Sequence, residues 1–346
     1  MNTDDFDFEL PPELIAQTPA RPRDSSRLMV LDRRTDSLTH SHFHDIDRFL
    51  RPGDLLVLNQ TRVIPARLYA RKQPGGGKVE LLLLKKEADR MWEVMAGGKG
   101  ISQGKRLRLI AGQTASSSLD CEVIQVRDGP RRLVKFSEEI EPYLVEIGHV
   151  PLPPYIHRPA VDPDDYQTVF ARDPGSVAAP TAGLHFTSEL LDRLDEKGIA
   201  SVYVTLHIGL DTFAPVTETK AEEHAIHSEW CRLGVESSTA INATRAAGGR
   251  IVAVGTTAVR TLETAARRTA SGRGVAPFEG NTDLFILPGH QFLAVDALVT
   301  NFHLPRSTLL MLVSAVAGRE RILSAYEAAK HEGYRFYSFG DAMLII

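Results

Sequence analysis

Short runs of alternating apolar and polar residues follow one another between residues 62 and 138. They occupy residues 62–72, 78–87, 91–98, 106–112, 119–128 and 131–138, and a Gly75-Gly76-Gly77 turn separates the first two. Alternation with a period of two residues is typical of β-strands that bury one face. Because six such runs follow at turn-like intervals, the pattern predicts a small antiparallel β-barrel.

On both sides of this region, strand-like apolar runs alternate with helix-like segments. The strand-like runs occupy 202–210, 250–255, 283–289 and 292–302, and the helix-like segments occupy 187–198, 257–268 and 307–318. Such alternation is typical of an α/β layer. We therefore predict an α/β main domain made of residues 1–61 and 151–346, with the β-barrel inserted as residues 62–150. The proline-rich segment 150–159 marks the return to the main domain, since consecutive prolines resist both helix and sheet.

Composition is that of an ordinary globular protein, but the charge is unevenly distributed. The 346 residues are 43% hydrophobic and carry a formal net charge of −4, which argues against a nonspecific coat for nucleic acid. Residues 61–150 alone carry +5, which leaves −9 for the rest of the chain. The inserted region is therefore the candidate surface for a polyanion.

Two features of the chain predict a cytoplasmic protein without a membrane anchor. The acidic start is the opposite of a secretory signal, and the apolar run 309–317 is shorter than the ~20 residues that span a bilayer. Cys121 and Cys231 lie far apart and lack the spacing of a zinc or redox motif.

Three stretches of the predicted α/β domain place polar or small residues where strands end and helices begin. The first contributes Thr256, Thr257 and Arg260 after the run 250–255, and the second contributes Thr181, Ala182, Gly183 and His185 in the loop 176–186. The third contributes Asn301 and His303 at the end of the run 292–302. Ligands gather at the carboxyl ends of strands in open α/β sheets, and helix starts offer free N–H groups. The alternative is that the threonines only cap a helix and that the loops only pack. Small residues let the backbone approach a ligand closely, and Gly183 can adopt positive φ.

Three further histidines are candidates for proton transfer or metal binding. His207 stands at the end of a predicted strand, where it is either a general base or a satisfied core residue. On a helix, His224 and His227 would share a face next to Glu229, which permits a metal site, but no further ligand stands at signature spacing. The alternating histidines at 40, 42 and 44 are better interpreted as a solvated strand face.

Nine stretches in order carry a resemblance to one known family. They are FDFELPPELIAQTP (6–19), DLLVLNQTRVIPARL (54–68), PLPPYI (151–156), APTAGLHFT (179–187), VTLHIGLDTF (204–213), HAIHSE (224–229), VAVGTTAVRTLE (252–263), VTNFHLPRSTLLMLVSA (299–315) and YRFYSFGDAMLI (334–345). Together they resemble the S-adenosylmethionine:tRNA ribosyltransferase-isomerases of queuosine synthesis. One position departs from the pattern, because Asp211 stands where the family usually has glycine.

The resemblance implies a monomeric enzyme that transfers and isomerises the ribosyl group of S-adenosylmethionine. Its acceptor is the aminomethyl group of 7-aminomethyl-7-deazaguanine at the wobble position of tRNA, and its products are epoxyqueuosine in tRNA, adenine and methionine. S-adenosylmethionine is then a cosubstrate, and neither a prosthetic group nor a metal is expected.

This chemistry needs a base, a donor-binding crevice and a surface for RNA. The candidate catalytic residues are His185, His207, His224, His227 and Glu229. The candidate donor-binding residues are Thr181, Ala182, Gly183, Asp211, Thr256, Thr257, Arg260, Asn301 and His303, with Arg260 suited to a carboxylate. The candidate tRNA-binding residues are Arg62, Arg67, Lys105, Arg106 and Arg108. The competing hypotheses are a noncatalytic RNA-binding protein and a metal-dependent hydrolase.

Overall fold

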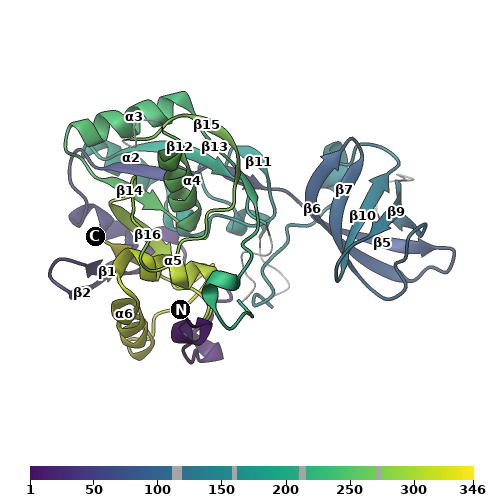
Figure 1. Ribbon diagram of the computed structural model, residues 1–346, viewed down its shortest axis with the longest axis horizontal. Coiled ribbons are helices and arrows are strands. Elements are labelled where there is room, and N and C mark those ends of the chain that lie inside the picture. The colour runs from purple at the N-terminus through teal and green to yellow at the C-terminus, as the bar shows by residue number, and fades with distance from the viewer. Residues whose placement is uncertain (111–118, 158–161, 210–215, 270–273) are drawn as a thin grey trace. The chain divides into compact units, whose positions relative to one another are not determined.

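The computed structural model describes residues 1–346 except 111–118, 158–161, 210–215 and 270–273. The chain forms two compact units (Figure 1). The main unit comprises Met1–Arg62, Pro153–Asp173 and Ala179–Ile346, and the barrel unit comprises Val63–Leu152 and Pro174–Ala178. The predicted combination of an α/β domain with an inserted antiparallel barrel is confirmed.

The main unit is built on a nine-stranded mixed sheet in the order β15-β13-β12-β3-β14-β16-β17-β1-β2. Its centre is parallel, since β12 pairs with β3, β3 with β14 and β14 with β16 in the same direction. The strands are β1 (Arg27–Asp32), β2 (Ser37–His42), β3 (Leu55–Asn59), β12 (Ala200–Leu206), β13 (Glu229–Leu233), β14 (Ile251–Val254), β15 (Phe278–Thr282), β16 (Ala297–Asn301) and β17 (Ala342–Ile345). The carboxyl ends of β12, β3, β14 and β16 consequently lie along one edge of the sheet.

Helices cover both faces of this sheet, as its continuously buried strands require. Strand β3 shows how, because Leu55 and Val57 enter one apolar cluster while Leu56 and Leu58 enter the other. The first cluster takes side chains from α3 (Val235–Ala246), α4 (Thr256–Arg267), α5 (Thr308–Ala317) and α6 (Arg319–His331). The second takes side chains from α2 (Ser188–Glu196) and from a 3₁₀ helix at Phe43–Arg48.

The barrel unit is a closed six-stranded antiparallel barrel in the order β10-β7-β6-β5-β8-β9. The strands are β5 (Arg67–Gln73), β6 (Lys78–Ala88), β7 (Met91–Gly97), β8 (Arg106–Leu109), β9 (Asp120–Val126) and β10 (Arg131–Phe136), and α1 (Leu144–Ile147) follows them. In β8 the leucines are buried and the arginines exposed. This alternation is the one that predicted strands from the sequence.

Two short strands, β4 (Thr61–Val63) and β11 (Asp173–Ser176), form a separate two-stranded sheet. Among the described residues, no helix is long and apolar enough to cross a membrane.

The strand predicted at 283–289 is wrong, because the structure has β15 at Phe278–Thr282 instead. Backbone groups in and after the predicted segment are bonded by side chains of α4. The carbonyl of Leu284 accepts from Arg260, and the amides of Leu293 and Ala294 donate to Glu263. An apolar run alone does not reveal such side-chain partners.

Candidate functional site

A pocket in the main unit brings together the three stretches that the sequence marked as binding segments. It lies at the carboxyl ends of β14 and β16, where Gly255 and Thr300 line it. Six of the expected donor-binding residues line it: Thr181, Ala182, Thr256, Thr257, Asn301 and His303. The remaining lining residues are Ala179, Pro180, Ile208, Gly255, Thr300 and Leu309. Segments more than a hundred residues apart thus form one site, which we call the donor pocket.

Helix α4 begins at the donor pocket without a side-chain cap. Its N-cap is Gly255, whose φ of 87° and ψ of 155° suit glycine, and among the described residues no side-chain hydrogen bond caps the helix. The alternative that Thr256 or Thr257 only caps the helix is therefore wrong. The first amides of this 12-residue helix remain available to a ligand group that accepts hydrogen bonds.

The side chain of Thr257 is held by Asn59, a residue that sequence reasoning missed. Asn59 ends β3, and its amide nitrogen donates to Thr257 Oγ1 at 3.2 Å and to the carbonyl of Leu206 at 3.0 Å. Its amide oxygen accepts from the backbone N–H groups of Thr61 and Leu206. In the sequence, Asn59 closes the apolar run LLVLN and falls in the matching stretch 54–68, but neither signal reveals its partners.

Gly183 does not line the donor pocket, and the expected positive φ is not found. A β-carbon at this position would lie 2.8 Å from Phe170 Cζ and 2.9 Å from Thr168 Cγ2. Both neighbours are buried. Glycine therefore lets the 3₁₀ helix Thr181–His185 pack closely against them.

His185 is buried, and each of its ring nitrogens faces a protein group. Its Nδ1 lies 2.8 Å from Ser26 Oγ, and its Nε2 lies 3.1 Å from the amide nitrogen of Asn301. Burial, with smaller contributions from Arg23 and Arg335, lowers the pKa of His185 to about 3. The ring is consequently neutral near pH 7.

His303 lines the donor pocket and is also neutral near pH 7. Its Nε2 lies 2.7 Å from Thr300 Oγ1, and its backbone amide donates to the hydroxyl of Tyr326. Burial lowers the pKa of the His303 ring to about 3.

A second pocket adjoins the donor pocket, since Leu309 lines both. Its other lining residues include His224, His227, Glu229 and Arg260, together with apolar side chains such as Phe285. We call it the histidine pocket.

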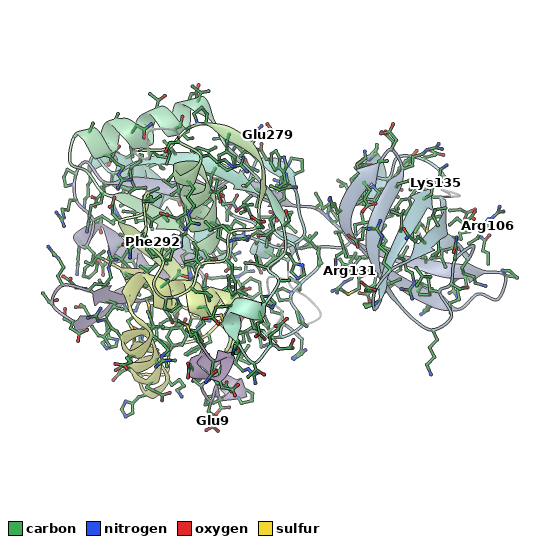
Figure 2. The ribbon with its side chains drawn as sticks, in the orientation of Figure 1. Glu9, Arg106, Arg131, Lys135, Glu279 and Phe292 are labelled. Carbon is green, nitrogen blue, oxygen red and sulfur yellow. The ribbon has the colours of Figure 1, made fainter. Side chains whose placement is uncertain are left out.

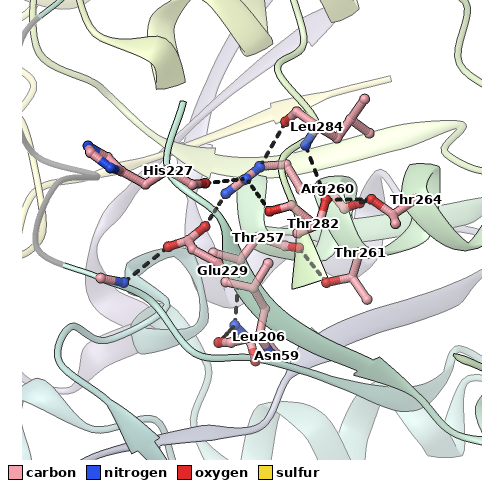
Figure 3. Close-up of polar contacts among 11 residues, drawn as sticks. Asn59, Leu206, His227, Glu229, Thr257, Arg260, Thr261, Thr264, Thr282 and Leu284 are labelled. Carbon is pink, nitrogen blue, oxygen red and sulfur yellow. Dashed lines mark hydrogen bonds and ion pairs between the residues drawn. The ribbon is translucent and has the colours of Figure 1, made fainter. Parts of the chain in front are cut away.

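The buried Arg260 of α4 directs its guanidinium at Glu229 and at backbone carbonyls (Figure 3). Its Nη1 pairs with Glu229 Oε2, its Nε donates to the carbonyl of Leu284 at 3.0 Å, and its Nη2 faces the carbonyls of His227 and Thr282. The other oxygen of Glu229 accepts from the amide of Gly209 at 3.1 Å. The pair ties α4, the start of β13 and the segment after β12 together.

His224 and His227 do not share a helical face, because the 3₁₀ helix Ala221–Glu223 ends before them. His224 Nδ1 is 2.9 Å from Glu218 Oε2, and the ring of His227 points away from Arg260 in Figure 3. Within the described ranges, no three side chains of the His, Cys, Asp or Glu type are grouped as metal ligands would be.

His207 lies just after β12 and is not among the residues that line either pocket, although its neighbour Ile208 lines the donor pocket. Its Nδ1 is 2.8 Å from Thr61 Oγ1, and its ring stacks on Trp230 with centroids 4.9 Å apart. Partial burial lowers the pKa of His207, while Asp173 raises it and Arg232 lowers it further. Asp211, the position that departs from the family pattern, lies outside the described residues.

The five expected tRNA-binding residues lie on or near β4, β5 and β8. Arg62 is exposed, and Arg67 is 3.2 Å from Glu80. Arg106 projects from the barrel (Figure 2) and faces Glu122 at 3.6 Å, while Arg108 pairs with Asp120 at 3.0 Å. The neighbouring Lys105 is half-buried. Carboxylates of β9 thus offset part of the positive charge of β8.

Comparisons with known proteins match the whole chain. The family described as "Queuosine biosynthesis protein" matches residues 3–345. Two curated relatives named S-adenosylmethionine:tRNA ribosyltransferase-isomerase, from Moorella thermoacetica and Symbiobacterium thermophilum, are each 51% identical, with 100% of both chains covered. A solved structure of S-adenosylmethionine tRNA ribosyltransferase from Thermotoga maritima is 40% identical, covers 99% of this chain and 100% of its own, and has a TM-score of 0.57.

Proposed function

Because the chain belongs to the family of queuosine biosynthesis proteins, we propose that it is an S-adenosylmethionine:tRNA ribosyltransferase-isomerase. It transfers and isomerises the ribosyl group of S-adenosylmethionine onto tRNA. The observation that carries this proposal is the full-length identity of 51% to relatives of that name. The donor pocket supports it, because it lies at the carboxyl edge of the sheet beside an uncapped helix start.

The acceptor in this proposal is the aminomethyl group of 7-aminomethyl-7-deazaguanine at the wobble position of tRNA. Its amine nitrogen forms the new bond to the ribosyl carbon, and the rearrangement releases adenine and methionine and leaves epoxyqueuosine in the tRNA. S-adenosylmethionine is consumed as a cosubstrate, and no prosthetic group takes part.

The reaction requires a base near the sulfonium, because the positive sulfur acidifies the neighbouring ribose methylene. Of the five candidates, His224, His227 and Glu229 line the histidine pocket beside the donor pocket. We assign proton removal to His224, since its Nδ1 contact with Glu218 orients the ring as a carboxylate orients a catalytic histidine. Glu229, paired with Arg260, positions the walls of this pocket.

We further propose that the main unit binds the donor and carries the chemistry, while the barrel unit contacts tRNA. The excess of positive charge in residues 61–150 supports this division. The protein acts in the cytoplasm, where its tRNA substrate is, and it acts as a monomer.

Incubation with S-adenosylmethionine and tRNA that carries the aminomethyl base tests the proposal. We expect free adenine to appear in proportion to ribosylated tRNA, with neither formed when one substrate is omitted. A noncatalytic RNA-binding protein would bind the tRNA without releasing adenine. A metal-dependent hydrolase would lose its activity with a chelator and would not modify the tRNA.

A further inference from the structure

A chain of four hydrogen-bonded side chains runs through the core to the donor pocket. Ser26 Oγ is 2.8 Å from His185 Nδ1, His185 Nε2 is 3.1 Å from the Asn301 amide nitrogen, and the Thr181 hydroxyl donates to the Asn301 amide oxygen at 2.9 Å. Ser26, His185 and Asn301 are 3%, 4% and 2% exposed, whereas Thr181 is half-buried at the pocket. Water therefore does not replace the contacts behind Thr181.

The direction of every donor in this chain follows from one backbone carbonyl. The amide nitrogen of Asn301 also lies 3.3 Å from the carbonyl of Tyr337, which only accepts hydrogen bonds. The amide is therefore oriented with its N–H groups toward Tyr337 and His185, so His185 Nε2 accepts. The proton of the neutral ring is then on Nδ1, which donates to Ser26.

The same reasoning fixes the hydroxyl of Thr181. Its proton is donated to Asn301, so the oxygen offers only lone pairs to a ligand. Phe43 stacks on the His185 ring with centroids 5.0 Å apart and restrains its tilt.

Thr257, which also lines the donor pocket, differs from Thr181 because its hydroxyl oxygen accepts a hydrogen bond from the protein and its proton is left to donate. Two backbone amides donate to the Asn59 oxygen, so the Asn59 nitrogen is the donor to Thr257 Oγ1. The proton of the Thr257 hydroxyl has no acceptor among the hydrogen bonds of the described residues. Thr257 is thus prepared to donate to a ligand, while Thr181 is prepared to accept from one.

We propose that Thr181 accepts a hydrogen bond from the adenosyl part of the substrate and that Thr257 donates one to it. His185 is then a positioning residue, because it fixes the direction in which the Thr181 hydroxyl donates. The inference rests on the proposed function, because it takes S-adenosylmethionine as the ligand. Two parts of an adenosyl group present the required chemistry. They are the amine and ring-nitrogen edge of adenine and the vicinal hydroxyls of ribose.

Isosteric variants test the contacts to the ligand. Thr181→Val and Thr257→Val remove one hydroxyl each, and we expect each to weaken binding of S-adenosylmethionine about 2- to 13-fold in calorimetry, the range for one hydrogen bond. The loss of affinity caused by Thr181→Val should disappear when the ligand is an analogue of S-adenosylmethionine that lacks the group donating to Thr181. The N6-dimethylated analogue tests adenine, and the 2′,3′-dideoxy analogue tests ribose. Unchanged affinity in both variants, or a loss that persists with both analogues, overturns the proposal.

Nitrogen-15 spectra of the parent protein test the role of His185. Nitrogen-15 spectra of the histidines report which ring nitrogen carries the proton, and a His185→Gln variant identifies the signal. We expect a neutral ring protonated at Nδ1 between pH 5.5 and 8. A ring protonated at Nε2, or one that titrates near pH 6.5, contradicts the assigned polarity.

Steady-state kinetics separate positioning from catalysis. His185→Gln keeps an acceptor for Asn301, so we expect it to raise KM for S-adenosylmethionine several-fold and to leave kcat within about threefold. His185→Leu removes the acceptor and should raise KM further. If both variants instead lose kcat by 100-fold or more at unchanged KM, His185 takes part in the chemistry and the proposal is wrong. If the parent protein binds S-adenosylmethionine but releases no adenine, the proposed function fails while the spectra still test the hydrogen-bond chain.

Discussion

At the residue scale, the two fully buried histidines make the stability of the main unit depend on pH. The folded-state pKa of His185 and of His303 is about 3, below the ordinary value near 6.5. Between these values the unfolded chain binds protons that the folded chain does not, so stability is fully present above pH 6.5 and is lost as the pH falls toward 3. Because of these two rings, the free energy of unfolding at pH 5.5 should be about 2–3 kcal/mol lower than at pH 7.5.

Urea unfolding at pH 7.5, 6.5 and 5.5 measures this dependence. Trp230 lies in the main unit and Trp92 in the barrel unit, so fluorescence of a Trp92→Phe protein reports on the main unit alone. Adding His185→Gln to the Trp92→Phe protein should reduce by about half the unfolding free energy that is lost between pH 7.5 and 5.5. The matched control His331→Gln, at an exposed site, should leave it unchanged. Equal pH dependence in all three proteins contradicts the prediction.

Arg260 shows why a role suggested by residue type needs the structure. The sequence made it a partner for the methionine carboxylate, but the guanidinium is directed at Glu229 and at backbone carbonyls. Arg260→Ala would leave the buried Glu229 without this cation, and we expect it to destabilise the main unit by about 3–5 kcal/mol. The measurement is again urea unfolding of the Trp92→Phe protein.

The matched control is the double variant Arg260→Met, Glu229→Gln. It removes both charges, so it should recover part of the stability that Arg260→Ala loses. A stable Arg260→Ala protein with weakened binding of S-adenosylmethionine would return Arg260 to the role of carboxylate ligand.

At the scale of elements, the sequence predicted best where periodicity alone decides the structure. The barrel strands and α2, α4 and α5 follow from the spacing of apolar residues, and the Thr187 side chain caps α2 by accepting from the amide of Leu190. Elsewhere, contacts with side chains from distant parts of the chain determine which structure a segment adopts. The segment 283–289 bonds to α4, and His224 contacts Glu218 rather than a helical neighbour. Local patterns contain no information on such partners.

The start of α4 is the element whose geometry should matter most for donor binding. Gly255→Ala would place a β-carbon 3.6 Å from the Ala182 side chain, which is ordinary contact, so any effect comes from the backbone. A φ of 87° with a ψ of 155° is open only to glycine and should cost about 1–3 kcal/mol in alanine. We expect the helix start to shift and the affinity for S-adenosylmethionine in calorimetry to fall several-fold.

Gly248→Ala provides the control, since Gly248 has a φ of +80° with no atom near a β-carbon and lies outside the lining of the donor pocket. It should lower the free energy of unfolding by about 1 kcal/mol without changing donor affinity. If both variants lose affinity alike, general destabilisation explains the effect, and the helix start has no special role.

At the scale of the whole molecule, the sequence predicted which segments form the site but not how they are connected. Six of the nine expected donor-binding residues line one pocket. The hydrogen bonds that orient them come from Asn59, Ser26 and the backbone carbonyl of Tyr337, none of which was among the candidate site residues. Which group of the site donates a hydrogen bond and which accepts one depends on contacts between segments far apart in the sequence. Residue types alone therefore do not determine these directions.

Turnover should survive exhaustive chelation. Among the described residues, no three His, Cys, Asp or Glu side chains are grouped as a metal site needs, and His224 in the histidine pocket contacts Glu218 instead. We expect adenine release after EDTA treatment and desalting to stay within twofold of the untreated rate. Activity that disappears and returns with added zinc would contradict this prediction.

The uneven charge of the chain should make the two substrates differ in their response to salt. Contacts with tRNA phosphates lose affinity steeply as salt rises, whereas a pocket in the main unit should bind S-adenosylmethionine with little salt dependence. The variant K105E/R106E/R108E should therefore weaken tRNA binding and lower the slope of log affinity against log salt by about 2–3, while donor affinity stays unchanged.

Carboxylates on β9 make a matched control possible. Glu122 and Asp120 face Arg106 and Arg108, so Glu122→Gln with Asp120→Asn removes their competition with the phosphates. This double variant should bind tRNA more tightly and steepen the salt slope, because it leaves the arginines without their protein partners. The competing interpretation is that these residues form a solvated face, as charged residues on exposed strands often do. If both variants match the parent protein in tRNA affinity and in salt slope, that interpretation is correct, and the RNA docks mainly on the main unit.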